Sequence, residues 1–198
     1  MAQKAPRYAR PALSLIEDEI GHENVSLYIG GADAARDISL LGEHNITTVV
    51  NCAVNLDINY VENPNLPADG DRKASGSAPV RTYKIGLVDG DGNPEKLMLA
   101  GYYILESALE QRLPEKASYP VRERGNVLVH CRGGRSRSVA LVALFLHKKK
   151  PQAYPTYDDA LKHIREKREL HPDEWFETPK QVLTDIALRA SDDIESLK

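Results

Sequence analysis

An apolar run that stops at a cysteine, two glycines and three arginines most constrains what this chain can fold into. The stretch VLVHCRGGRSRSVALVALFL spans residues 127–146. Its first apolar run predicts a buried strand, and its second predicts a buried helix. The loop between them combines little side-chain bulk with much positive charge, which is unsuited to core packing. We therefore expect a strand-loop-helix unit whose loop holds an anion.

Strand and helix patterns alternate along the rest of the chain. Strand patterns occupy residues 25–31, 46–54, 80–88 and 126–130, and helix patterns occupy 32–45, about 93–113, 138–150, 156–170 and 178–191. This alternation predicts an α/β fold with a central, mainly parallel sheet flanked by helices. Functional groups in such folds gather at the carboxyl ends of strands. Cys131 lies directly after the strand predicted at 126–130.

The length of 198 residues suits a single domain over residues 1–198. Within it, we expect an N-terminal extension over about residues 1–24. We also expect a solvated polar loop over about residues 55–79, which are rich in Pro, Asp, Asn, Ser and Gly.

Composition argues against several classes of protein. The net charge is −3 and the basic residues are dispersed, which does not suit nucleic-acid binding. The two cysteines have neither C-x-x-C spacing nor a zinc-type Cys/His cluster, so a reducing compartment fits best. No signal-peptide pattern and no membrane-spanning apolar stretch is present in the sequence. We expect a cytoplasmic protein without integral membrane contact.

The loop after His130 has the side chains that bind phosphate. Gly133 and Gly134 allow tight turns and close approach of the backbone to a ligand. Cys131 lies at a predicted helix N-terminus among cations, and such surroundings lower a thiol pKa from about 8.5 to roughly 3.5–7.5. Arg137 can reach back and bind two phosphate oxygens with its planar guanidinium group. The loop therefore favours both a bound phosphate and a reactive thiolate.

Three segments of the sequence resemble parts of one protein family, and they occur in the order in which that family has them. HCRGGRSRS (130–138) resembles the Cys-x5-Arg signature of the cysteine-dependent protein tyrosine phosphatase superfamily. LYIGGADAARDISLLGEHNITTVVNCA (27–53) is similar to the opening strand, helix and strand of dual-specificity phosphatases, and YKIGLVDGDGN (83–93) to their general-acid loop. The resemblance covers much of residues 25–150, and the last third resembles the family loosely, as helices. It implies the dual-specificity phosphatase fold and a cysteinyl-phosphate mechanism without metal or cofactor.

The resemblance also implies roles for individual residues. Cys131 would be the nucleophile, and Ser138 would hydrogen-bond the leaving thiolate. Asp89 would be the general acid, with Asp91 as the alternative, and His130 would organise the loop. The expected phosphate-binding residues are Arg132, Gly133, Gly134, Arg135, Ser136 and Arg137.

The substrate stays open at this point. A dual-specificity phosphatase acting on phosphorylated proteins is the first choice, because no separate phosphotyrosine-recognition motif is evident. Arg132 and Arg135 resemble basic residues that meet additional phosphates in the phosphoinositide 3-phosphatase branch, although both side chains could equally point to solvent. The alternatives are therefore an enzyme for a small phosphorylated molecule, such as an inositol phosphate or phosphoinositide, and a non-catalytic phosphate-binding module.

Two further residues carry expectations of their own. Cys52 ends a strand expected beside the strand of Cys131, so it is either a small core residue or a redox partner of that cysteine. Trp175 is expected to pack the start of a helix against the core.

Overall fold

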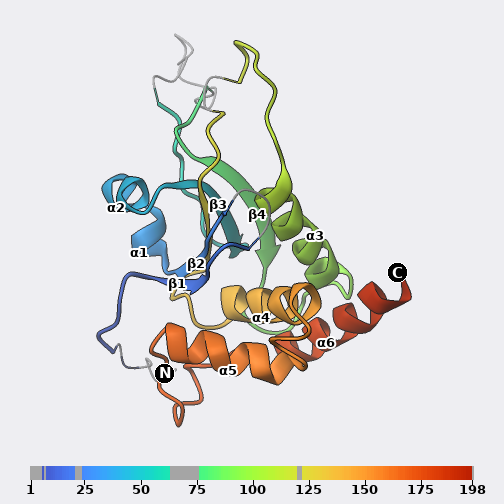
Figure 1. Ribbon diagram of the computed structural model, residues 1–198. Coiled ribbons are helices and arrows are strands. Elements are labelled where there is room, and N and C mark those ends of the chain that lie inside the picture. The colour runs from blue at the N-terminus through green and yellow to red at the C-terminus, as the bar shows by residue number, and fades with distance from the viewer. Residues whose placement is uncertain (1–5, 7, 21–23, 63–75, 120–121, 198) are drawn as a thin grey trace.

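A sheet of five strands, counted over the residues that the structure describes, forms the centre of the molecule (Figure 1). The structure is a computed structural model that describes residues 6, 8–20, 24–62, 76–119 and 122–197. In sequence order the strands are β1 (Leu13–Glu17), β2 (Leu27–Gly30), β3 (Ile46–Ala53), β4 (Arg81–Leu87) and β5 (Asn126–His130). In the sheet they follow the order β1-β2-β5-β3-β4. All neighbours are parallel except β1 and β2, which confirms the mainly parallel sheet.

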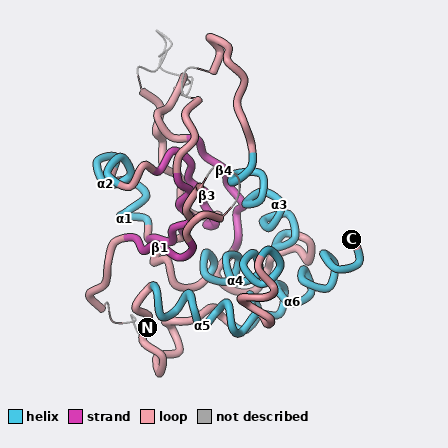
Figure 2. The backbone as a smooth tube through the Cα atoms, in the orientation of Figure 1, coloured by secondary structure: helices cyan, strands magenta, loops and turns pink. Residues whose placement is uncertain are grey.

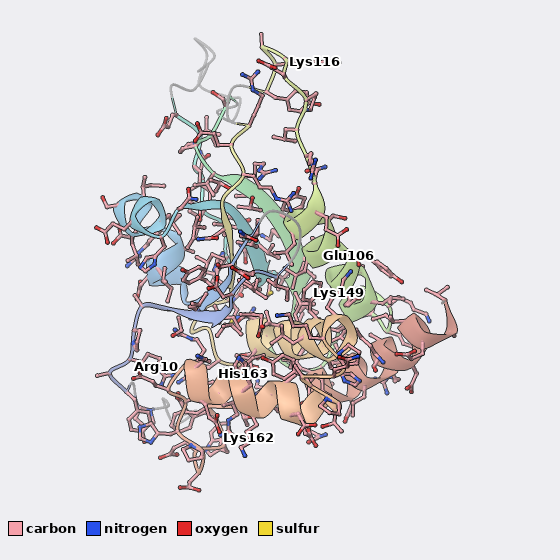
Figure 3. All side chains as sticks on the ribbon, viewed as in Figure 1. Arg10, Glu106, Lys116, Lys149, Lys162 and His163 are labelled. Atoms are coloured by element: carbon pink, nitrogen blue, oxygen red, sulfur yellow. The ribbon has the colours of Figure 1, made fainter. Side chains whose placement is uncertain are left out.

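Helices cover both faces of this sheet (Figure 2). In the described part of the chain they are α1 (Ala32–Ala35), α2 (Ile38–Glu43), α3 (Leu97–Glu110), α4 (Arg137–Lys149), α5 (Tyr157–Lys167) and α6 (Gln181–Ser196). α1 and α2 pack on one face. α4 packs on the other face against β3 and β5, and α3, α5 and α6 surround it. An ion pair between Glu106 of α3 and Lys149 of α4 joins two of these helices (Figure 3).

The three central residues of strand β5 are apolar because both faces of the strand are buried. Val127 and Val129 point into the larger core beneath α4, whereas Leu128 points into the smaller core beneath α1 and α2. All three side chains are almost completely buried. An unbroken apolar run is expected for such an interior parallel strand. The apolar run ends at Val129, and the polar His130 is the last residue of the strand.

The helix predicted over 32–45 forms as two short helices, α1 and α2. Asp37 between them has extended backbone geometry, and its carboxylate accepts a hydrogen bond from the Leu40 amide at 3.0 Å. Asp competes well for such a capping position because it satisfies an amide that has no partner inside the helix. The aspartate therefore starts a new helix instead of continuing the first.

The structure adds detail to the two segments expected as an extension and a loop. Strand β1 lies within residues 1–24 and forms the edge of the sheet by pairing with β2. In the segment 55–79, residues 63–75 lie outside the described residues. Tyr60 of this segment is buried, and its hydroxyl donates a hydrogen bond to the Ala35 carbonyl. This part of the loop therefore packs on α1 rather than standing free in solvent.

The expectation for Trp175 is wrong. Its side chain is 76% exposed, and its ring meets Phe176 edge-on with 5.6 Å between ring centroids. The residues between α5 and α6 therefore turn Trp175 away from the core.

Candidate active site

The carboxyl ends of the parallel strands bring the predicted site residues together. Cys131 directly follows β5, Asp89 lies just after β4, and Asn55 lies just after β3. Because these strands are parallel neighbours, the residues that follow them meet at the same end of the sheet, where the strands have their carboxyl ends. The connector 111–119 extends from the other end of the sheet, where β5 begins, and Lys116 marks its tip in Figure 3. The structure thus gathers residues from three loops around Cys131.

Residues 131–137, which we call the Cys131 loop, are tightly fitted to the start of α1. The Arg132 carbonyl accepts a hydrogen bond from the Ala32 amide at 3.0 Å. Gly134 has a φ of +64°, and a Cβ atom built there would lie 2.5 Å from the Gly30 carbonyl oxygen. A side chain at residue 134 would therefore be strained in its backbone and would clash. The glycine lets the loop turn closely against β2 before α4 begins.

Cys131 lies buried in this loop, and its sulfur is 3.3 Å from the Ser138 hydroxyl oxygen. Burial by itself raises the pKa of the Cys131 thiol. Hydrogen bonds from the Ser138 hydroxyl and the Ser138 and Ser136 amides, together with the charge of Arg137, outweigh burial and hold that pKa below its ordinary value. Amides at a helix N-terminus stabilise a negative sulfur in this way. The geometry therefore favours a thiolate.

Arg137 is the first residue of α4, and its guanidinium group is fixed by the loop after β3 and by the end of β4. Its Nη1 donates to the Asn55 side-chain oxygen at 3.1 Å and to the Leu87 carbonyl at 3.2 Å. Arg137 is 4% exposed, and its Nε has no hydrogen-bond partner among the described residues. A buried N–H group without a partner is costly. A bound oxyanion would supply an acceptor for it.

Asp89 contacts the Cys131 loop through its side chain. Its Oδ1 accepts a hydrogen bond from the Ser136 hydroxyl at 2.7 Å. Lys180, just before α6, donates to the Asp89 carbonyl oxygen, and Asn93 bonds back to the main chain of Val88 and Gly90. The loop that carries Asp89 is therefore held from two sides with its carboxylate on the Cys131 loop.

His130 is almost completely buried at the end of β5. Its Nδ1 lies 3.2 Å from the Cys131 carbonyl oxygen, and because a carbonyl only accepts, this nitrogen must carry the proton. Burial above all, aided by the charge of Arg137, lowers the pKa of His130 to about 4, although the hydrogen bond to the Cys131 carbonyl opposes the shift. A neutral His130 thus fixes the first peptide of the loop, and its organising role stays a prediction.

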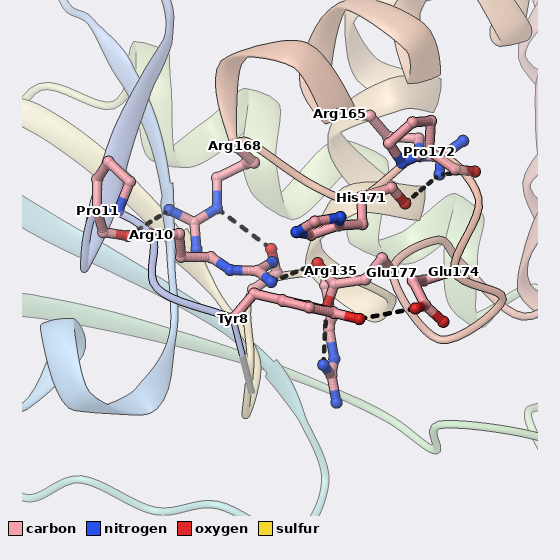
Figure 4. Close-up of polar contacts among 11 residues, drawn as sticks. Tyr8, Arg10, Pro11, Arg135, Arg165, Arg168, His171, Pro172, Glu174 and Glu177 are labelled. Carbon is pink, nitrogen blue, oxygen red and sulfur yellow. Dashed lines mark hydrogen bonds and ion pairs between the residues drawn. The ribbon is translucent and has the colours of Figure 1, made fainter. Parts of the chain in front are cut away.

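The two other arginines of the loop have different surroundings. Arg132 is exposed. Arg135 forms an ion pair with Glu177, with 2.8 Å between Nη1 and Oε1 (Figure 4). Its guanidinium group also lies over the ring of Phe176. The sequence left open whether both would meet a second phosphate or both would point to solvent. Arg132 faces solvent, and Arg135 is bound to protein.

Sequence reasoning missed a buried arginine beneath the loop. Arg168 donates to the Pro11 carbonyl at 3.0 Å (Figure 4). It also donates to the Ser14 hydroxyl at 3.0 Å and to the Gly134 carbonyl at 3.3 Å. Burial lowers the pKa of Arg168 to about 10, so it stays charged at neutral pH. It joins the Cys131 loop to the segment before β1. Nothing in the local sequence signals this role, because it depends on the packing of α5.

Asn55, Glu177 and Lys180 were also missed. Asn55 had a usable signal, since it is a polar residue shortly after a predicted interior strand. Glu177 and Lys180 lie between α5 and α6, and only the tertiary fold brings them to the loops that carry Cys131 and Asp89.

Cys52 lies beside the site in the neighbouring strand. Asn51 pairs in register with His130, so the two cysteines follow residues that are directly opposite each other. Burial, reinforced by the negative charge of Cys131, raises the pKa of the Cys52 thiol well above its ordinary value. Both cysteines are free. Cys52 is therefore a protonated core residue, and its redox role stays untested.

Within the described ranges, no group of three or more His, Cys, Asp or Glu residues suits a metal ion. Over the same ranges, no helix combines the length and apolar character that crossing a membrane requires.

Solved structures share this arrangement of strands and helices, although no model of a known protein family matches the chain. The Yvh1 phosphatase domain from Chaetomium thermophilum is 22% identical, with a TM-score of 0.64 over 92% of this chain and 96% of that chain. A variant of human DUSP28 is 17% identical, with a TM-score of 0.60 over 95% of this chain and 99% of that chain. The human tyrosine phosphatase-like serine/threonine/tyrosine-interacting protein is 18% identical, with a TM-score of 0.53 over 87% and 93%. The chain has the dual-specificity phosphatase fold, which confirms the fold implied by the sequence resemblance.

Proposed function

We propose that this protein is a cysteine-dependent phosphomonoester hydrolase of the dual-specificity type, acting on phosphorylated proteins. The observation that carries the proposal is the Cys131 thiol, whose pKa is held low beside Ser138 and Arg137. A stabilised thiolate next to a buried guanidinium N–H that has no partner among the residues described suits nucleophilic attack on a phosphate.

In the first step, the Cys131 thiolate attacks phosphorus. The S–P bond forms as the bond to the leaving oxygen breaks. Arg137 and the amides of the Cys131 loop stabilise the charge on the other phosphate oxygens. Asp89, in its protonated form, gives its proton to the departing alkoxide or phenoxide. The products are cysteinyl phosphate and a free hydroxyl group on the former substrate.

In the second step, water attacks the phosphorus of the cysteinyl phosphate. The Asp89 carboxylate takes a proton from the water as the P–O bond forms, and the S–P bond breaks. The Ser138 hydroxyl, 3.3 Å from the sulfur, stabilises the departing thiolate. Inorganic phosphate leaves and the enzyme is restored. We expect no metal or cofactor in either step, because the loop amides and Arg137 supply the charge stabilisation that a metal ion gives elsewhere.

A non-catalytic phosphate-binding module is the alternative from another class. It is supported by the likeness to a protein whose name describes it as phosphatase-like and interacting. Such a module would bind oxyanions without forming cysteinyl phosphate. The presence of Cys131, Arg137 and Asp89 around one point favours the enzyme.

Turnover of p-nitrophenyl phosphate under reducing conditions tests the proposal. Wild-type protein should release p-nitrophenol, and Cys131→Ser should release none while still binding tungstate. Rapid acid quenching of the wild-type reaction should leave phosphate on the Cys131 peptide, as seen by mass spectrometry. Full activity of the serine variant would contradict the mechanism, and an inactive wild-type protein that binds tungstate would favour the binding module.

We also propose a cytoplasmic location. Two free cysteines, one of them needed as a thiolate, suit a reducing compartment. Cell fractionation tests this point, and recovery of the protein in an oxidising compartment would contradict it.

A further inference from the structure

Arg135 is held in place by three contacts away from its own backbone. Its Nη1 lies 2.8 Å from Glu177 Oε1, and its guanidinium carbon lies 5.2 Å from the centre of the Phe176 ring. Its side chain also folds over Gly133, since a Cβ atom built there would lie 3.4 Å from Arg135 Nε. The guanidinium group is therefore docked on the segment between α5 and α6 (Figure 4).

Glu177 is well suited to keep this arginine. Its side chain is fully buried, and its other oxygen binds Arg10. Although burial raises the pKa of Glu177, the hydrogen bonds and charges of Arg135 and Arg10 outweigh it and keep the carboxyl ionised. A buried carboxylate that loses a partner pays a desolvation penalty. Movement of Arg135 toward a ligand would impose that penalty on Glu177.

The other cationic side chains near the site are buried, bound to protein groups or exposed to solvent. Arg137 is buried in the Cys131 loop, and Arg168 is buried beneath it and bound to the Gly134 carbonyl. Lys180 donates to the Asp89 carbonyl. Arg132 is exposed, and its carbonyl accepts a hydrogen bond from the Ala32 amide at the start of α1. A ligand with several adjacent phosphates needs additional cations near the first phosphate. Arg135 is the loop residue closest in sequence to Arg137 that could supply one, and its charge is already matched by Glu177.

We propose that Glu177 is a specificity-determining residue that withholds Arg135 from the anion site. The site then selects phosphomonoesters that carry no second phosphate beside the first, as on a phosphorylated protein side chain, over polyphosphorylated inositols. This inference rests on the proposed function, because it names the substrate class of the same site. Glu177 acts through Arg135 and does not contact the substrate.

The test measures anion affinity by calorimetry in the Cys131→Ser background, so it does not depend on turnover. The probes are inorganic phosphate and inositol hexakisphosphate. Adding Glu177→Gln should free Arg135 and tighten hexakisphosphate binding by roughly tenfold, as one new charge-assisted contact would, while phosphate affinity stays within about twofold. Adding Arg135→Gln to that variant should remove the gain.

The matched control is Arg10→Gln, which removes the other partner of Glu177 and leaves Arg135 paired. It should leave the ratio of the two affinities unchanged. A gain equal to that of Glu177→Gln would overturn the proposal, as would a gain that survives Arg135→Gln. Circular dichroism checks that each variant is folded.

A second measurement covers the case in which Glu177→Gln does not fold. Arg135→Gln alone, with Glu177 intact, should change hexakisphosphate affinity by no more than about twofold. A loss of roughly tenfold would mean that Arg135 already binds the ligand and would overturn the proposal. Failure of the proposed function has a different signature: wild-type protein would not turn over p-nitrophenyl phosphate, whatever the effect of Glu177.

Discussion

The Asp89 carboxylate accepts a hydrogen bond from the Ser136 hydroxyl, with 2.7 Å between the two oxygens. This contact joins the loop after β4 to the loop after β5, although the two residues are 47 positions apart in sequence. It places a carboxylate on the loop that carries Cys131. Asp91 lies in the adjacent turn between two glycines with positive φ. The arrangement supports Asp89, rather than Asp91, as the proposed general acid.

Replacing Asp89 with Asn should lower kcat/KM, which reports the first step, by roughly a hundredfold or more for substrates with poor leaving groups. The loss should be smaller for p-nitrophenyl phosphate, because its leaving group needs little protonation. Steady-state kinetics across a series of aryl and alkyl phosphates measures the difference. Asp91→Asn is the matched control and should behave like wild type; the opposite pattern would move the role to Asp91.

Arg137→Lys keeps the positive charge but removes the planar guanidinium group and its buried Nε. We expect kcat/KM for p-nitrophenyl phosphate to fall by roughly a hundredfold, and tungstate binding to weaken. Arg36→Lys, at an exposed ion pair with Asp33, is the control and should leave both unchanged. If Arg137→Lys retained full activity, bidentate binding by the guanidinium would be excluded.

Gly134→Ala should destabilise the fold by about 2 kcal/mol or more, because the residue has positive φ and its new Cβ would meet the Gly30 carbonyl. Gly42→Ala is the control: it lies in α2, where a Cβ atom meets nothing within 4 Å. That change should be neutral or slightly stabilising. Urea denaturation of both variants provides the comparison, and equal stabilities would contradict the tight fit of the loop.

His130 should make the protein less stable in mild acid. Its pKa is 6.5 in the unfolded chain and about 4 in the fold, mainly because of burial. Between these values the unfolded chain binds a proton that the folded protein does not, so stability falls as pH drops through this range. From pH 7.5 to pH 5, the wild-type protein should lose about 2 kcal/mol more unfolding free energy than His130→Asn. Equal losses in urea denaturation would show that His130 is not buried in neutral form.

The alternation of strands and helices and the Cys-Gly-Arg loop were predictable because each leaves a local pattern. Strand β5 was predicted to its ends, since its apolar run and the polar residues after it coincide with the strand. Helices α1 and α2 were predicted as one, because the capping role of Asp37 competes with helix propensity over a few residues.

The partners of the loop were not predictable from local sequence. Arg168 and Glu177 reach the loop only because α5 and the residues after it fold back against the sheet. The numbers of residues that separate them from Cys131 follow no periodic pattern and belong to no motif. Arg135 shows how far local sequence can predict such contacts. Its residue type predicts either a side chain that binds phosphate or one that points to solvent. Its pairing with Glu177 depends on tertiary contacts.

The pKa of the Cys131 thiol is the most direct test of the account. The ultraviolet absorbance of the thiolate, taken as the difference between wild type and Cys131→Ser, should titrate with a midpoint clearly below the ordinary value of about 8.5. Cys52→Ser should leave this titration in place, because Cys52 stays protonated in the core. A midpoint at or above the ordinary value would contradict a loop that stabilises the thiolate.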